Sequence, residues 1–248
     1  MIALAREPSP SFVNALSEHP GKGTIDFARA LDQHRRYAAA LRRAGVAVEY
    51  LAPAESFPDA VFVEDAAIVL PRQAWICSMR EPSRRGETGT VMEALRKYRP
   101  VEVLAPPAYI DGGDVLNVEG TLYVGLSRRT NREAAEMLSR RASCPTVPVA
   151  VHAGLHLKTS AAYLGKNVLV VDPAKVETAP FANLRRVEVE GDESANCLAV
   201  GDTVLVSASS PRLAKRLRDL GFDVVELDIG EFEKADGGVT CLSLLIPG

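Results

Sequence analysis

Short runs of β-favouring apolar residues recur along the chain in closely spaced pairs. Polar and glycine residues separate the two runs of each pair, a pattern typical of β-hairpins. The paired runs are 67–70 with 74–77, 115–118 with 121–124, 160–164 with 168–171, and 197–200 with 203–206. The pattern therefore predicts four hairpins spread evenly over most of the chain.

Most of these hairpins are followed by a segment with helical periodicity, and then by another strand. Residues 87–98, for example, carry apolar positions every three to four residues, as on one face of a helix. Thr130 is the expected N-cap of the helix after the second hairpin. The helices are expected at 87–98, 131–140 and 212–220, with only an irregular or short helix at 174–184. The following strands are expected at 101–104, 146–149, 186–189 and 222–227.

A fifth copy of this unit is split between the two ends of the chain. Its strands are predicted at 241–246 and 2–5, its helix at 27–44 and its last strand at 46–51. Joining the first and last strands in one unit closes a ring and hides the sheet edges. We therefore expect an α/β fold, a five-fold pseudosymmetric α/β propeller of strand-strand-helix-strand units, forming one domain over 1–248. An open α/β sheet is the alternative.

The loops before the first strand of each unit concentrate the polar chemistry of the chain. They are 57–65, 111–115, 154–158, 193–196 and 236–241. Equivalent loops of a closed ring converge at one end, so these loops predict a single site. One thiol (Cys241), one imidazole (His156) and several carboxylates would meet there.

This constellation favours a guanidinium substrate. Clustered buried carboxylates are costly without a cation, and a planar, permanently charged guanidinium would satisfy them. Such a cation would also favour the thiolate of Cys241. Thiolate attack on the guanidinium carbon, with His156 as acid and then as base, predicts a ureido product. Taken singly, Cys241 could be a core residue, His156 a satisfied polar residue, and 111–114 a plain turn.

Composition narrows the remaining classes. The net charge is −3 and no long basic run occurs, which argues against nucleic acid as a partner. No apolar stretch is long enough to span a bilayer, and the first residues do not suit a signal peptide, so a cytoplasmic protein is expected. The four cysteines are far apart, which argues against a zinc cage and disulfides. No metal or organic cofactor is expected, although a thiol beside His156 could capture zinc as an inhibitor.

Six motifs of the chain, four of them at these loops, resemble those of the dimethylarginine dimethylaminohydrolase family, within the pentein or amidinotransferase superfamily, and the resemblance covers nearly the whole chain. The motifs are Phe62-Val63-Glu64-Asp65, Pro82-Ser83-Arg84-Arg85, Asp111-Gly112-Gly113-Asp114-Val115-Leu116, 124–131, Gly154-Leu155-His156-Leu157-Lys158 and Thr240-Cys241. The resemblance implies the same five-unit propeller.

The resemblance also implies a role for individual residues. Cys241 would be the nucleophile, His156 the general acid/base, and Asp111 a carboxylate beside the guanidine carbon. The expected substrate-binding residues are Leu16, Asp59, Glu64, Asp65, Arg84, Arg129, Ala235 and Asp236. Among them, Asp65 would hold the guanidine and Glu64 would lie along the substrate. Asp59 and the Leu16 carbonyl would bind the α-amino group, and Arg84 and Arg129 would bind the α-carboxylate. Ala235 and Asp236 match the loop that precedes the nucleophile.

The function that the resemblance implies is hydrolysis of Nω-methylated L-arginine, asymmetric dimethyl- or monomethylarginine, to citrulline and methylamines. Alternatives are hydrolysis of another Nω-substituted arginine such as hydroxyarginine, arginine deimination, amidino transfer, and a non-catalytic arginine-binding module. Deiminases usually carry an aspartate where this chain has Lys158, which disfavours deimination. Residues 16–23 are expected to form a mobile lid. A homodimer is left open.

Overall fold

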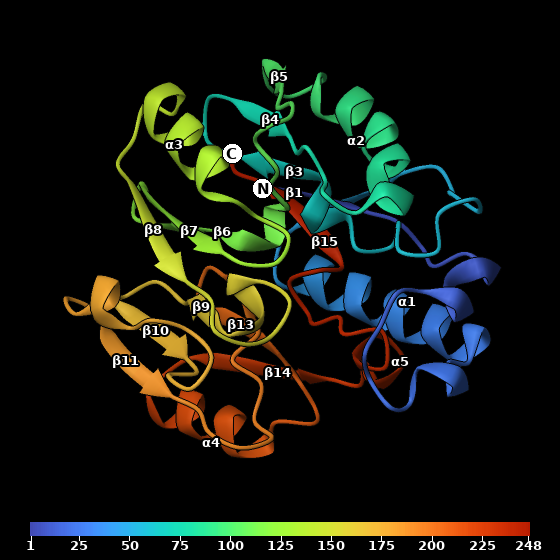
Figure 1. The fold of residues 1–248 in the computed structure, drawn as a ribbon. Coiled ribbons are helices and arrows are strands. Elements are labelled where there is room, and N and C mark those ends of the chain that lie inside the picture. The colour runs from blue at the N-terminus through green and yellow to red at the C-terminus, as the bar shows by residue number, and fades with distance from the viewer.

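The secondary structure of this protein, described over all 248 residues of a computed structural model, repeats five times around a central axis (Figure 1). Each repeat is a three-stranded sheet whose first two strands are antiparallel and whose third strand lies parallel to the second. This arrangement confirms the predicted α/β propeller of strand-strand-helix-strand units.

The five sheets follow one another along the chain. They consist of β15 (Ser243–Ile246), β1 (Ile2–Ala5) and β2 (Ala47–Tyr50); β3 (Ala67–Val69), β4 (Ala74–Ile76) and β5 (Val101–Val103); β6 (Val115–Val118), β7 (Thr121–Leu126) and β8 (Thr146–Ala150); β9 (Ala161–Tyr163), β10 (Val168–Val171) and β11 (Arg185–Glu188); and β12 (Cys197–Val200), β13 (Thr203–Ser207) and β14 (Asp223–Leu227). All four predicted hairpins are therefore present.

Helices make the crossovers between the parallel strands in four units. They are α1 (Phe27–Arg43), α2 (Thr88–Leu95), α3 (Arg132–Arg141) and α4 (Pro211–Asp219), and a short α5 (Gly230–Glu233) precedes β15. The crossover between β10 and β11 has only a 3₁₀ turn, Ala179–Phe181, in line with the expectation of an irregular or short helix.

The N-cap prediction for α3 was wrong by one residue. Asn131 caps the helix, because its side chain accepts a hydrogen bond from the Ala134 N–H at 3.2 Å. The Thr130 hydroxyl donates to Asp114 at 2.6 Å instead. Both residue types are good N-caps. The hydroxyl of Thr130 is engaged by the buried carboxylate of Asp114, so Asn131 caps the helix.

The ring closes by pairing the two ends of the chain. Ile2 lies opposite Ile246 in the antiparallel pair of β1 and β15, and the two termini lie close together near the axis (Figure 1). This closure leaves each sheet with its first strand next to the axis and its third strand at the rim. No helix combines the length and the apolar character that crossing a membrane requires.

Short 3₁₀ helices precede the first strand in three consecutive units. They are Val63–Ala66, Gly112–Asp114 and Leu157–Thr159, and they contact one another in sequence around the axis. In the fifth unit, the strand predicted from 241 begins only at Ser243, so Cys241 lies in a turn ahead of it. The apolar run continues through the turn and conceals this boundary.

Candidate active site

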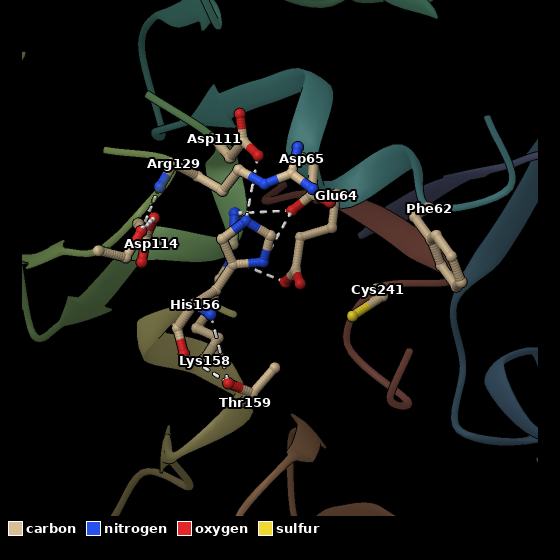
Figure 2. A network of polar contacts seen from close by, with 12 residues as sticks. Phe62, Glu64, Asp65, Asp111, Asp114, Arg129, His156, Lys158, Thr159 and Cys241 are labelled. Carbon is tan, nitrogen blue, oxygen red and sulfur yellow. Dashed lines mark hydrogen bonds and ion pairs between the residues drawn. The ribbon is translucent and has the colours of Figure 1, made fainter. Parts of the chain in front are cut away.

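The imidazole of His156 is buried among carboxylates at the axis of the propeller (Figure 2). Its Nε2 lies 3.1 Å from Asp111 Oδ2, and its Nδ1 lies 3.7 Å from Asp65 Oδ1. The side chains of His156 and Asp111 are only 3% and 0% exposed. The loops before β3, β6 and β9 thus meet at one imidazole, as predicted for converging loops.

Two glycines allow these units to approach so closely. A Cβ on Gly113 would stand 2.6 Å from Asp65 Oδ1 and 2.8 Å from His156 Nδ1, and a Cβ on Gly112 would collide with the Glu64 carbonyl. The Gly113 N–H also donates to Asp65 Oδ1 at 3.1 Å. Only glycine fits at both positions, so the pair of glycines builds the site rather than a simple turn.

Asp114 belongs to the same cluster, although sequence reasoning gave it no role. One carboxylate oxygen accepts from the Leu157 N–H at 2.8 Å, and the other accepts from the hydroxyls of Ser127 and Thr130, both at 2.6 Å. Burial raises the pKa of Asp114 to about 6. Its place at the end of the repeat-equivalent loop 111–114 was the available signal.

The surroundings of His156 favour its protonated form. Burial alone would lower the pKa of the imidazole, but the charges of Asp65, Asp114 and Asp111, with the hydrogen bond to Asp111, outweigh it and raise the pKa to about 9. His156 is therefore an imidazolium at neutral pH and can donate a proton.

Asp111 retains an unused oxygen inside the site. Its Oδ1 is buried and has no hydrogen-bond partner. A buried acceptor without a donor is costly, so this oxygen is available to an N–H of a bound ligand. Asp65, Asp111 and His156 each offer one metal-ligand atom within 4.8 Å of the others. However, the protonated form of His156 has no lone pair free for a metal ion, so it cannot act as a ligand in that form.

Cys241 lies across the site from His156, with Glu64 between them in the view of Figure 2. Burial raises the pKa of the thiol to about 12, and the negative charges of Glu64 and Asp65 act in the same direction. The Gly238 N–H, 3.4 Å from Sγ, opposes this shift. The sulfur is therefore a neutral thiol until another positive charge arrives.

Glu64 is held by protein groups rather than left free along a substrate channel. One oxygen accepts from the Thr240 hydroxyl at 2.7 Å, and the other lies 2.7 Å from Lys158 Nζ. These contacts fix the carboxylate of Glu64, and its expected place along the substrate stays a prediction.

Arg84 lies in the interior of the protein, next to Asp65. Its buried guanidinium forms ion pairs with Asp65 at 2.7 Å and Glu87 at 2.9 Å, and it reaches the carbonyls of Asp59 and Phe62. Burial would lower the pKa of Arg84, but these carboxylates raise it well above its ordinary value. Arg84 thus fixes the carboxylate of Asp65, and its expected role at the α-carboxylate together with Arg129 stays a prediction.

A pocket of about 670 Å³ is lined by Leu16, Arg129 and Asp236, together with Arg80 and Arg128. Asp65, Asp111, His156 and Cys241 are not among its lining residues, although Thr159 and Ser160, close to His156 in the chain, are. The Arg129 side chain is 15% exposed and its Nη1 has no hydrogen-bond partner; the nearest carboxylate oxygen, on Glu81, is 3.9 Å away. Arg129 is therefore only loosely paired with Glu81, and its Nη1 can still donate a hydrogen bond.

The remaining predicted residues gather at the edge of this pocket. Asp59 is buried, and its carboxylate accepts from the Leu16 N–H at 3.0 Å. Asp236 has a left-handed backbone, with φ of 56°, and accepts from the Glu18 N–H at 2.8 Å. Ala235 is buried beside it. The segment expected to be a lid is thus held at both Asp59 and Asp236.

Comparison with known proteins identifies the family. A family model described as "N,N dimethylarginine dimethylhydrolase, eukaryotic" matches residues 10–180. The dimethylarginine dimethylaminohydrolase of Pseudomonas aeruginosa is 38% identical, over 97% of this chain and 97% of that protein.

Solved structures agree with this result. A Cys-to-Ser mutant of the Pseudomonas aeruginosa enzyme, in complex with citrulline, has a TM-score of 0.93 and 36% identity, and 98% of each chain is covered. A His-to-Gly variant of a dimethylarginine dimethylaminohydrolase, as an adduct with S-methyl-L-thiocitrulline, also has a TM-score of 0.93, with 37% identity and 98% of each chain covered. The chain belongs to the dimethylarginine dimethylaminohydrolase family.

Proposed function

We propose that this enzyme hydrolyses Nω-methylated L-arginine, as asymmetric dimethyl- or monomethylarginine, to L-citrulline and the corresponding methylamine. The observation that carries the proposal is the unpartnered Oδ1 of Asp111, buried beside His156. A guanidinium N–H satisfies this oxygen with a charge-assisted hydrogen bond. The citrulline complex of the Pseudomonas aeruginosa relative supports the same product.

The positive charge of the substrate is proposed to lower the pKa of the Cys241 thiol. A guanidinium placed against Asp65 and Asp111 puts a positive charge beside Cys241, which opposes the effect of Glu64 and Asp65 on the pKa of the thiol. The thiolate then becomes accessible at neutral pH, and it is the nucleophilic form. In this proposal the substrate promotes ionisation of its own nucleophile.

The covalent steps follow from this arrangement. Sγ of Cys241 bonds to the guanidinium carbon, and the C–N bond to the methylamine breaks as His156 gives that nitrogen a proton. Water then attacks the thiouronium carbon, and His156 takes one proton from the water. The C–S bond breaks as the second proton of the water passes to the departing sulfur, which restores the thiol of Cys241 and releases citrulline. The pKa of His156, about 9, suits the first of these transfers.

Arg129 is proposed to bind the α-carboxylate, because it lines the pocket with Leu16 and Asp236 and its Nη1 makes no hydrogen bond. Asp59, the Leu16 carbonyl and the loop at Ala235 and Asp236 are proposed to hold the amino-acid end. Arg84 and Glu64 are proposed to act through Asp65 and Thr240, their hydrogen-bonded neighbours, rather than on the substrate itself.

The test is incubation with asymmetric dimethylarginine, followed by quantification of citrulline and dimethylamine. The wild type should release the two in equal amounts, Cys241→Ser should release neither, and Cys144→Ser should match the wild type, since Cys144 is half-exposed and outside the site. A folded wild type without turnover, or turnover by Cys241→Ser, would refute the proposal. A panel with hydroxyarginine and arginine, compared by kcat/KM, separates the alternative hydrolases.

A further inference from the structure

Four polar residues, each from a different unit, form a closed ring of polar contacts across the axis of the propeller, through their side chains and one backbone carbonyl. Asn196 Nδ2 donates to Thr240 Oγ1 at 2.9 Å, and that hydroxyl donates to Glu64 Oε2 at 2.7 Å. Glu64 Oε1 lies 2.7 Å from Lys158 Nζ. The Lys158 carbonyl accepts the second N–H of Asn196 at 2.8 Å, which completes the ring.

Every other member of the ring is a close chain neighbour of a residue in the proposed chemistry. Glu64 precedes Asp65, Thr240 precedes Cys241, and Lys158 lies two residues after His156. Asn196 has no such neighbour, and it bonds to the loops that carry the thiol and the imidazole. Its only apparent task is to hold these loops in register.

Asn196 also fixes the turn that carries the sulfur. Its Oδ1 accepts the Thr240 N–H at 3.1 Å, and its side chain packs so closely on Gly238 that a Cβ there would collide with it. The Gly238 N–H is the donor to Cys241 Sγ. One buried amide therefore braces both ends of the turn 238–241.

We propose that Asn196 is a positioning residue that holds the turn 238–241 so that the sulfur of Cys241 faces the guanidinium site. This inference rests on the proposed function for its kinetic consequence. A displacement of about 1 Å between reacting groups lowers a rate by roughly 100-fold, whereas substrate binding at Asp65 and Arg129 is left intact. Loss of Asn196 therefore lowers kcat and leaves KM nearly constant.

The kinetic test uses Asn196→Ala with Gln33→Ala as its matched control. Gln33 is also a buried amide that joins two segments, donating to Asp228 at 2.7 Å and accepting from the Glu231 N–H at 3.0 Å. Asn196→Ala should lower kcat for asymmetric dimethylarginine by about 30-fold with KM within about 3-fold, as expected for misplaced reacting groups. Gln33→Ala should lose thermal stability only. Equal kcat losses in both variants, or none in Asn196→Ala, overturn the proposal.

A second pair of variants covers the case in which Asn196→Ala does not fold. Thr240→Val removes the hydroxyl at nearly constant volume, and Thr240→Ser retains it. The proposal requires a loss of kcat in Thr240→Val that Thr240→Ser restores. Similar kcat values for the two variants contradict it.

Alkylation of Cys241 by iodoacetamide, followed by mass spectrometry, separates this inference from the proposed function because it needs no substrate. The wild-type thiol is buried and should react slowly. Asn196→Ala should release the turn and accelerate alkylation several-fold, while Gln33→Ala should not. An unchanged rate in Asn196→Ala refutes the positioning role, whereas a wild type inactive on methylated arginine refutes only the proposed function.

Discussion

The two ends of the proposed substrate site are built in opposite ways. At the inner end, Asp65, Asp111 and His156 are almost completely buried and joined by short polar contacts. At the outer end, the lid is held by an ion pair between Glu18 and Arg128, whose side chains are 77% and 64% exposed. The inner end is isolated from solvent, and the outer end is surrounded by it.

This difference predicts which kinetic constant each end controls. Charges act strongly where water is excluded and weakly where it is not. Burial raises the pKa of Cys241, and at His156 the nearby carboxylates outweigh the opposite effect of burial and raise its pKa. Changes at the inner end should therefore lower kcat. Changes at the outer end should raise KM, and by less as exposure increases.

The largest effect is expected from His156→Gln. Without an imidazole to protonate the departing amine, kcat should fall by roughly 1000-fold, within the range for loss of a general acid/base. Steady-state citrulline release measures it, with His152→Gln as the control because that histidine is exposed. Less than a tenfold loss would show that another group moves the proton.

His156 should also leave a signature in stability. Its pKa is raised from 6.5 to about 9 in the folded protein, so it contributes stability that is complete below about pH 6.5 and is lost as the pH rises through about 9. Urea unfolding should show the wild-type free energy of unfolding falling across this window, by on the order of 3 kcal/mol. His156→Gln should lack that decline.

Asp111→Asn should lower kcat by about 100-fold. The loss is smaller than for His156→Gln, because the amide that replaces the carboxylate can still form hydrogen bonds to His156 and to the substrate. This substitution should also lower the pKa of His156. The charge and hydrogen bond of Asp111 raise the pKa of His156, so the alkaline decline of kcat/KM, expected near pH 9 in the wild type, should shift to lower pH. A pH–rate profile measures this shift, and the exposed Asp219→Asn should not produce it. An unmoved alkaline limb would separate Asp111 from the proton donor.

At the outer end, Arg129→Ala should raise KM by about 10- to 100-fold with little change in kcat, as for loss of an ionic hydrogen bond to a bound carboxylate. The exposed Arg85→Ala is the matched control. A substrate analogue without the α-carboxylate, dimethylated agmatine, should show no difference between Arg129→Ala and the wild type. A difference with that analogue would mean that Arg129 does not act on the carboxylate.

The same contrast between local and distant information explains what the sequence could predict. The repeated hairpins depend on apolar runs and turn residues a few positions apart, and the converging loops follow from the repeat, so the fold and the meeting of Asp65, Asp111 and His156 were predictable. The engagement of Arg84 with Asp65 was not, because Arg84 lies outside the converging loops and its local sequence does not identify a partner. The loop that carries Asn196 was expected to converge with that of Thr240, but the sequence does not say which side chains of two converging loops form hydrogen bonds. Such pairings exist only after the units have packed.

The smallest effect is expected from Glu18→Ala, at the most exposed part of the outer end. Exposed ion pairs contribute little, so loss of the contact with Arg128 should raise KM by only about two- to fivefold, and roughly 1 M salt should abolish the difference from the wild type. The backbone N–H of Glu18 keeps its hydrogen bond to Asp236 in this variant, which limits the movement of the lid. Arg128→Ala should give a change of the same size, and the double variant should be no worse than either single one. A loss of kcat above about tenfold that persists in salt would mean that residues 16–23 help to order the buried end. The comparison would then fail, because the exposed end would control kcat as well as KM.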